Sequence, residues 1–342
     1  MLDLAKRRGS DQEIGLLEDT ITYAPELSVI MGRPIVGTQY KTTHRTLPTV
    51  SFRMPNTGTK TVKGAYRQSL KECMIIDGQI QADKAVVDAE GGGEGPQSSV
   101  GDILVDEAQG VIMAAYITVG AQLYYGTGSD SNGFIGLNTL TPNLNKAKNQ
   151  NPAVVDAGGT SVGAQSSAYL LWENIRGAHF IFGNNAALTM LPEWRIQQVS
   201  DDNDSTKKYT AYVNNLQGWI GFAVNHPNSI GRIGNINLVS DSKPLTDNLV
   251  AQLLSFMPLQ MRQEVIANAN VGGPNKWGPG LKLMVNPIVA YSLQQSRSPI
   301  SSGVGTAITA ADQLRFAELP TASNGVPIVL TDSITSTEAK LT

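Results

Sequence analysis

The sequence has one cysteine, Cys73, and three histidines in 342 residues. A single cysteine excludes an internal disulfide and fits a chain that folds in a reducing cytoplasm. The histidines, His44, His179 and His226, lie far apart, and neither H-E-x-x-H nor C-x-x-C occurs. Zinc sites need ligands at recognisable short spacings. We therefore expect no disulfide framework, no metal site and no cofactor.

Charge is also sparse. Asp, Glu, Lys and Arg make up 16% of the residues, and 26 basic against 29 acidic side chains give a net charge of -3. A protein that holds nucleic acid by its phosphates normally presents a strongly basic face, so this balance argues against that class. Few charges are also unusual for a freely soluble monomer, which indicates that much surface is buried against other subunits.

Long apolar runs are missing too. No segment approaches the roughly 20 apolar residues that a membrane span requires, and the mean hydropathy is slightly negative. The N-terminus, Met-Leu-Asp-Leu-Ala-Lys-Arg-Arg, lacks the apolar stretch of a secretory signal. We therefore expect no membrane partner.

Catalytic motifs are absent as well. A hydrolase needs a Ser or Cys beside a His that a carboxylate orients. His226 with Asp201 or Asp202 is a conceivable pair, but no G-x-S-x-G elbow is present. The glycines of 91–95 lack the Gly-Lys-Ser/Thr ending of a phosphate loop, and 130–133 lacks the glutamate that completes a calcium loop. We expect no catalytic residues.

The N-terminal part of the chain is polar and extended. Residues 1–43 are predicted to form an arm. Within it, Ser10 and Glu13 have the spacing of a capping box for a short helix. Pro25 and Pro34 then break any regular structure.

A hairpin is predicted over residues 44–72. Residues 49–54 alternate between apolar and polar, 55–58 have turn chemistry, and 59–63 would return as the second strand. An isolated two-stranded ribbon is marginal in water. We therefore expect the hairpin to be ordered by another chain. The predicted contact residues are Val50, Phe52, Met54, Lys60 and Lys63.

One long helix is predicted over residues 99–125. Ser99 and Asp102 form an S-x-x-D cap, apolar residues then recur every three or four positions, and Gly126 ends the helix. At 1.5 Å per residue it would be about 40 Å long. We expect it to be a strut packed on a sheet.

Shorter elements are predicted along the rest of the chain. The alternation of strands and helices over 240–335 predicts an α/β lobe. The predicted strands are 74–76, 85–87, 169–172, 179–182, 230–238, 281–285, 326–330 and a hairpin of 208–213 with 218–224; the predicted helices are 244–269, with a kink or break at Pro258, and 287–295.

These segments, taken in order, resemble the major capsid proteins of tailed bacteriophages with the HK97 fold, and most of all the podophage-type group. No single segment is diagnostic, but the set spans nearly the whole chain. The matching segments are 125–128 with 133–137, 168–173 with 177–183, 219–224 with 230–236, 284–287 and 325–334.

The resemblance implies an α+β subunit of the HK97-like capsid fold. Its parts would be an N-terminal arm (1–43), an E-loop hairpin (44–72), a P-domain (73–135 and about 200–240, with the spine helix 99–125) and an A-domain (about 136–199 and 241–342). Copies of the chain would form hexameric and pentameric capsomers of an icosahedral virion shell around double-stranded DNA, assembled in the host cytoplasm. No scaffolding domain precedes the arm, which suggests either a separate scaffolding protein or a domain that was already removed. The initial Met1 favours the former, so we expect a separate scaffolding protein, together with a portal and a decoration protein.

The only compact basic run is Lys6, Arg7 and Arg8. These residues either contact packaged DNA on the inner face of the shell or form a solvated terminus. Some family members cross-link a hairpin lysine to a neighbouring subunit, but nothing in this sequence supports that chemistry. Two alternative functions remain open: an encapsulin-like nanocompartment shell, which shares the fold, and an enzyme of unassigned chemistry that uses the 240–335 lobe.

Overall fold

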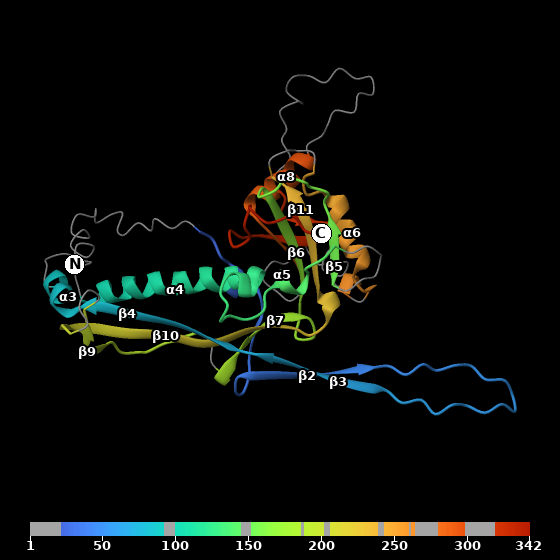
Figure 1. Ribbon diagram of the computed structural model, residues 1–342, viewed down its shortest axis with the longest axis horizontal. Coiled ribbons are helices and arrows are strands. Elements are labelled where there is room, and N and C mark those ends of the chain that lie inside the picture. The colour runs from blue at the N-terminus through green and yellow to red at the C-terminus, as the bar shows by residue number, and fades with distance from the viewer. Residues whose placement is uncertain are drawn as a thin grey trace, which may run out of the picture.

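The structure of the chain is a computed structural model. An elongated slab, a thicker lobe and a long protruding hairpin follow one another along its longest axis (Figure 1). The residues described are 22–91, 100–144, 152–185, 188–201, 206–238, 243–259, 261–263, 280–297 and 319–342.

The slab is built around one strand of 17 residues, β10 (Lys208–Val224). Along one edge β10 pairs antiparallel with β4 (Met74–Asp83), and along the other it pairs with β9 (Arg195–Ser200) and β8 (Thr189–Met190). Because successive side chains alternate between the two faces of a sheet, the even- and odd-numbered residues of β10 face opposite sides.

The spine helix α4 (Val100–Tyr125) lies along the even-numbered face of this sheet, and α3 (Lys84–Gly91) packs near its beginning (Figure 1). Gly78 on β4 allows the close approach of the helix, since a Cβ there would lie 3.0 Å from Cγ1 of Val111. The predicted strut is therefore confirmed. The helix residues buried in the subunit include Leu104, Ala108, Ala115, Val119 and Leu123.

The helix ends where predicted, and the physical reason is visible. Gly126 has a φ of +55°, in the left-handed region. A Cβ on Gly126 would also lie 2.2 Å from the backbone nitrogen of Gly136. The Gln122 side chain donates a hydrogen bond of 2.7 Å to the Phe134 carbonyl. The chain after the helix is thus fixed against the last helical turn.

The lobe contains the predicted α/β arrangement. Its central strand, β6 (Gln165–Glu173), pairs antiparallel with β11 (Ile230–Asn237) and β12 (Gly280–Val285). β14 (Val326–Leu330) runs parallel to β12. β7 (Ala178–Phe182) pairs with β10 and meets β6 at one residue pair, so the slab and the lobe share one sheet.

Two helices and several short elements complete the described fold. α6 (Asp247–Phe256) and α8 (Pro287–Arg297) pack on the lobe sheet. The short elements are α2 (Glu26–Val29), β1 (Gly32–Pro34), η1 (Gly126–Gly128), α5 (Leu137–Leu140), β5 (Ala153–Asp156), η2 (Gly183–Asn185), η3 (Pro227–Ser229) and β13 (Ala322–Ser323).

Two main apolar clusters hold these layers together. In the lobe, Leu170, Leu253 and Leu293 lie between the sheet and its helices. In the slab, Leu123 of α4 packs with Phe180, Phe222 and other residues of the sheet. Each of these side chains is almost fully buried, and such burial is worth about 1.5–3 kcal/mol per residue.

Most of the predicted elements of the second half are confirmed. The helix predicted over 244–269, with a kink or break at Pro258, is confirmed from 247 to 263 in the described residues: α6 ends at Phe256, Met257 is extended with ψ of 148°, and residues 259 and 261–263 are helical again. Pro258 explains this ending, since proline disfavours a helical conformation in the residue before it. The strands at 169–172, 179–182, 230–238, 281–285 and 326–330 and the helix at 287–295 are also confirmed.

Two predictions for the slab are wrong. Residues 85–87 are helical within α3, whose beginning is capped by a hydrogen bond from the Ala85 amide to the Asp83 carboxylate. The hairpin predicted for 208–213 with 218–224 is instead the single strand β10. The segment between remains extended because β4 pairs with β10 without interruption from Asp83 to Met74.

The lobe contains a strand that the sequence did not predict. β5 (Ala153–Asp156) lies in the segment 138–163, which looks like a polar loop. Val154 and Val155 are buried there, and the strand pairs in parallel with β11. Four residues are too few to show a period, so only the tertiary pairing reveals this strand.

By length and composition, the segment Val100–Gly128 could cross a membrane, contrary to the expectation that no segment approaches a span. This is weak support for a membrane protein, because the core helix of a globular fold meets the same criterion. Here one side of the helix packs on the slab sheet.

We predict that Leu123→Ala destabilises the unassembled subunit by about 2–5 kcal/mol, because it leaves a cavity between α4 and the sheet. Met113→Ala, at a helix position that is 40% exposed, is the matched control and should change stability by less than about 1 kcal/mol. Urea unfolding measures both. Equal losses in the two variants would contradict the packing of α4.

Candidate assembly interface

The protruding hairpin is longer than predicted and is paired only near its base. β2 (Gln39–Thr46) and β3 (Ala65–Glu72) form a two-stranded ladder that ends at the pair Thr46 and Ala65. Residues 47–64 continue outward with no strand pairing, so the strands predicted at 49–54 and 59–63 are wrong. The reason is that no third strand supports this distal part, and two strands alone are marginal.

The turn of the hairpin is where the sequence places it. The Thr57 amide donates to the Met54 carbonyl at 3.2 Å, the Thr57 hydroxyl donates to the same oxygen at 2.7 Å, and Asn56 has a φ of +65°. Asparagine tolerates this left-handed conformation better than most residues.

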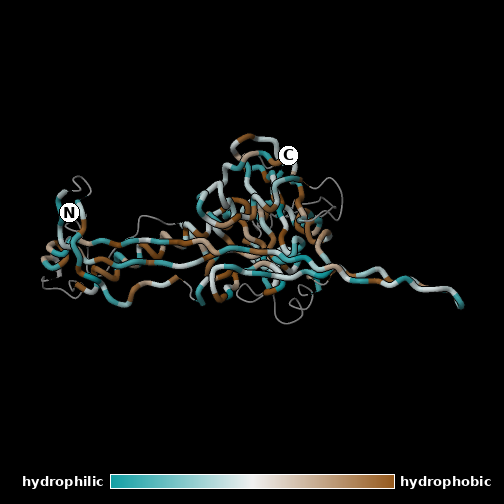
Figure 2. Tube along the Cα trace, turned by 60° about the horizontal axis from the view of Figure 1, so that its bottom comes forward, coloured by the Kyte–Doolittle hydropathy of each residue, from teal (hydrophilic) through white to brown (hydrophobic). Residues whose placement is uncertain are grey.

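The apolar residues of the tip have no packing partner among the residues that the structure describes. Phe52 is 107% exposed, Val50 80% and Met54 75%. Lys60 and Lys63 are exposed as well. Figure 2 shows apolar residues spaced along the protruding hairpin, well away from the main body. Exposed apolar side chains that lie close together are typical of surfaces that bind a partner.

The base of the hairpin, by contrast, is fixed to the slab. Tyr40 packs edge-on against the His179 ring at 5.5 Å between centroids, and Asn225 donates to the Tyr40 hydroxyl at 3.3 Å. Cys73 is buried nearby with Ile181, and burial raises the pKa of its thiol to about 11. This cysteine is therefore a packing residue with little thiolate character.

A buried ion pair holds the chain just before the hairpin. The Lys282 ammonium pairs with the Glu173 carboxylate and donates to the Val29 carbonyl at 2.7 Å, and the Met31 amide donates to Glu173. β1 then pairs in parallel with β7. Residues 29–34 are thus bound to their own subunit, although they lie within the predicted arm.

A second buried carboxyl, Glu26, joins three distant segments. It is fully buried in α2, accepts a hydrogen bond from the Thr331 hydroxyl, and lies against Gly120 of the spine helix. Its pKa is raised, mainly by desolvation and in spite of the hydrogen bond from Thr331. This carboxyl therefore favours the protonated form more strongly than a solvated glutamate does.

A third polar cluster fixes the C-terminal segment. Arg232 pairs with Glu338 at 2.9 Å, donates to Asn138 at 2.6 Å and lies over the Tyr169 ring at 5.3 Å. Tyr125 at the end of the spine helix donates to the other Glu338 oxygen at 2.7 Å. Both charged groups are almost fully buried. Removal of either one would therefore leave the other charge buried without its counter-ion, which is strongly destabilising.

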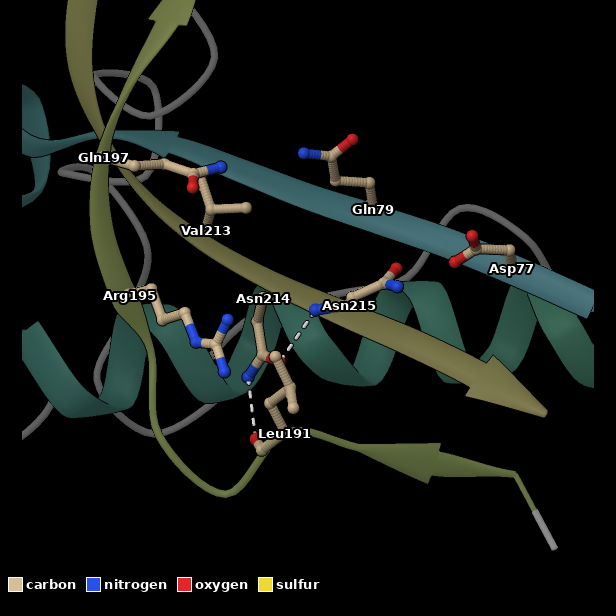
Figure 3. A pocket seen from close by; sticks show the side chains of 8 residues that line it. All are labelled: Asp77, Gln79, Leu191, Arg195, Gln197, Val213, Asn214 and Asn215. Carbon is tan, nitrogen blue, oxygen red and sulfur yellow. Dashed lines mark hydrogen bonds between the residues drawn. The ribbon is translucent and has the colours of Figure 1, made fainter. Parts of the chain in front are cut away.

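A polar pocket of about 320 Å³ opens in the slab. It lies beside a gap in the sheet edge, because β9 pairs with β10 up to Val213 and β8 pairs only from Leu216. Asn214 spans this gap by donating to the Leu191 carbonyl at 3.0 Å (Figure 3). The other residues that line it are Asp77, Gln79, Arg195, Gln197, Val213 and Asn215.

Two of the three histidines take part in the packing or the turns of the subunit itself. His226 accepts a hydrogen bond from the Asn228 amide at 3.1 Å in a turn, and His179 is buried under Tyr40. Burial lowers the pKa of both imidazoles. No group of three or more potential metal-ligating side chains occurs in the part of the chain that the structure describes. The basic run Lys6, Arg7 and Arg8 and the cap residue Ser99 lie outside the described residues.

We predict that Glu26→Gln stabilises the unassembled subunit at pH 7–8. The raised pKa of Glu26 means that folding must desolvate an ionised carboxylate once the pH rises above the folded-state pKa. Wild-type stability should therefore decrease as the pH rises from the unfolded-state value of 4.5 through the folded-state pKa. Calorimetric melting of both proteins from pH 5 to 8 should show their difference growing with pH. A constant difference would contradict this prediction.

We predict that Glu338→Ala destabilises the subunit by about 3–5 kcal/mol, because it leaves the Arg232 guanidinium buried without its counter-ion. Lys340→Ala, in the same segment but exposed, is the control and should change stability by less than about 1 kcal/mol. Denaturant unfolding measures both, and a small loss for Glu338→Ala would show that the C-terminal segment is not held by this pair.

Comparison with known proteins identifies the family. No curated protein sequence matches the chain. Among solved structures, the chain is similar to that of bacteriophage Epsilon15, with a TM-score of 0.67 and 17% identity over 99% of this chain and 96% of that chain. At this identity the likeness establishes the fold, which is therefore the phage capsid fold that the sequence resemblance predicts.

Two further structures are similar over a smaller part of the chain. The capsid of Myoviridae phage XM1 has a TM-score of 0.46 and 8% identity, over 67% of this chain and 98% of that chain. The SrpI encapsulin complex of Synechococcus elongatus has a TM-score of 0.43 and 9% identity, over 70% of this chain and 96% of that chain.

The sequence itself matches a family model described as "Major capsid protein GP7" over residues 36–342. This match includes the hairpin, the spine helix and the lobe. The chain belongs to the GP7 family of phage major capsid proteins, the shell-forming structural subunits of the capsid.

Proposed function

We propose that this chain forms an icosahedral head shell, in hexameric and pentameric capsomers, around double-stranded viral DNA. Assembly takes place in the host cytoplasm, and the finished shell is part of the virion. A scaffolding protein, a portal and a decoration protein complete the head in this proposal. The family of the chain and the HK97 fold support it.

The observation that supports self-assembly most directly is the hairpin. Its base is ordered by Tyr40 and Cys73 within the subunit, while its tip exposes Val50, Phe52 and Met54 to solvent. A rigid base with an apolar, unsupported tip suits contact with a neighbouring subunit. Lys60 and Lys63 are part of the same contact surface in this proposal.

Contact with the packaged DNA is weak and independent of sequence in this proposal. A net charge of -3 does not favour tight binding to a polyanion, and a container gains from mild attraction because tight binding would slow packing and ejection. Lys6, Arg7 and Arg8, at the end of the arm, are the proposed contacts on the inner face.

Electron microscopy of purified particles tests the function. Closed shells of uniform diameter, far larger than any oligomer expected of a 36.5 kDa enzyme, are the expected result. Their content then distinguishes a viral head, which holds double-stranded DNA, from a protein-filled nanocompartment. A chain that remains monomeric or forms only small oligomers would contradict the proposal.

We predict that deletion of residues 50–63 leaves the subunit folded but abolishes stable shells. The deletion removes the exposed tip and none of the buried residues of the two main cores. Circular dichroism and thermal melting should match the wild type to within about 0.5–1 kcal/mol, while electron microscopy should show no closed particles. Normal shells from the deletion variant would exclude the tip as an essential contact.

A further inference from the structure

We propose that residues 10–21 dock on an exposed apolar stripe of the spine helix α4 in the same subunit. The stripe is formed by Val105, Ile112, Met113 and Tyr116. This inference goes beyond the proposed function and does not depend on it, because it concerns a contact within one unassembled subunit.

The first argument is that α4 is more apolar than its packing on the sheet requires. The segment Val100–Gly128 is apolar enough to cross a membrane, yet only 28% of its most apolar stretch is buried. Val105 is 53% exposed, Met113 40% and Tyr116 38%, and Ile112 is only partly buried. At 3.6 residues per turn these four positions lie on one side of the helix. Such a stripe is typical of a surface that another segment covers.

The slab sheet contacts a different side of the helix. Val111 meets Gly78 of β4, and Leu104 and Val119 pack with residues of the sheet. Helical geometry places these three positions, on average, about 100° around the axis from the centre of the stripe. In Figure 1 the sheet lies along one side of α4 only. The sheet therefore leaves the stripe uncovered.

The second argument is that the described part of the arm already covers the next turn of the same side. The Tyr23 amide donates to the Asp332 carboxylate, and the Asp332 amide donates to the Tyr23 carbonyl, both at 2.9 Å. Glu26 then lies against Gly120 of α4. Gly120 follows Tyr116 by four residues, which is one helical turn. The residues before Tyr23 therefore start from the end of the stripe.

The third argument is the sequence of residues 10–21. Ile14, Leu17 and Ile21 are spaced by three and four positions, so a helix would present all three on one side. Three turns are too few for a stable isolated helix in water. An apolar surface at the point where the chain leaves α4 provides the stabilisation that such a short helix lacks.

The lengths of the two surfaces agree, and the point of entry fixes the direction. A helix over residues 10–21 would be about 18 Å long, and the stripe from Val105 to Tyr116 extends over about 17 Å at 1.5 Å per residue. The chain enters at the Tyr116 end, and the stripe continues only toward Val105. The docked segment is therefore antiparallel to α4, with Leu17 close to Met113.

The stripe of the same subunit is favoured over that of a second copy. Residue 21 is only two positions from Tyr23, which is fixed to its own subunit. The Met31 amide and the Val29 carbonyl are likewise bound to Glu173 and Lys282 of that subunit. A short connection to a fixed anchor gives a high effective concentration, so the contact within the chain forms before one between chains.

The docking also places the basic run of residues 6–8 near the beginning of α4. The first two turns of this helix carry Asp102, Asp106 and Glu107. Carboxylates close to the basic run would partly cancel its attraction for a polyanion. This agrees with the weak contact to DNA in the proposed function.

Limited proteolysis of the unassembled full-length chain tests the docking. An endoproteinase that cleaves after glutamate can cut at Glu13 and Glu18, inside the docked segment. Leu17→Lys and Met113→Lys should each make these cuts at least about tenfold faster, because cleavage follows the population of the undocked segment. The matched controls substitute the adjacent residues, Leu16→Lys and Ala114→Lys, which lie on other sides of their helices. Both controls should be cut like the wild type. Met113 and Ala114 are exposed, so these variants should fold.

Cysteine cross-linking tests whether both partners belong to one chain. A chain with Leu17→Cys and Met113→Cys should be joined internally by a short bismaleimide, and one with Leu17→Cys and Ala114→Cys should not. The native Cys73 is buried and should not compete for the reagent. A mixture of two chains that carry only Leu17→Cys or only Met113→Cys should give no cross-linked dimer.

Three results would overturn the docking. The first is cleavage of the wild type at Glu13 and Glu18 as fast as that of the Leu17→Lys variant. The second is equal cleavage of the Met113→Lys and Ala114→Lys variants, which would leave the stripe to another partner. The third is a cross-linked dimer in the mixture with no internal product in the double variant, which would assign the stripe to the arm of a second copy. None of these measurements requires shells, so failure of the proposed function is a separate result.

Discussion

The uninterrupted pairing of β10 with β4 and then with β7 is the constraint on which the rest of the structure depends. One strand of 17 residues belongs to the slab at one end and joins the lobe at the other. It therefore fixes the spine helix, the lobe and the base of the hairpin relative to one another. A hinge at residues 214–217, which the predicted hairpin would have created, would allow these parts to move independently. A shell subunit must hold its contact surfaces at both ends in a fixed relative position, and a continuous strand does so.

The chain ends of the described fold are held by buried polar groups in addition to apolar contacts such as those of Val29 and Ile334. Glu173 with Lys282 binds the chain before the hairpin, and Glu338 with Arg232 binds the C-terminal segment. Such pairs are costly to desolvate and are strongly directional, so they specify position more than they add stability. Glu26 belongs to the same group, but it lacks a cationic partner in the part of the chain described. Its raised pKa makes the docking of α2 sensitive to pH.

The local elements with strong chemical signals could be predicted from the sequence. The apolar repeat predicted the spine helix, and Gly126 predicted its end. Pro258 predicted the end of α6. The interruption at Asn214–Gln217 suggested a turn, yet β4 supplies hydrogen bonds that keep this segment extended. Residues 49–54 alternate as a strand does, yet no neighbouring strand is present to pair with them. In both cases the deciding partner is distant in sequence, so no local pattern can reveal it.

The sequence by itself determined the order of the parts, the family resemblance that the family match confirms, and the apolar residues of the hairpin tip. The tertiary structure alone decided which face of the sheet remains open, because that depends on where α4 and Tyr40 pack. It also decided that the hairpin tip and α3 lie at opposite ends of one subunit (Figure 1). The order of these parts is visible in the sequence, but their separation in space depends on how the strands pair, and that pairing is a property of the whole fold.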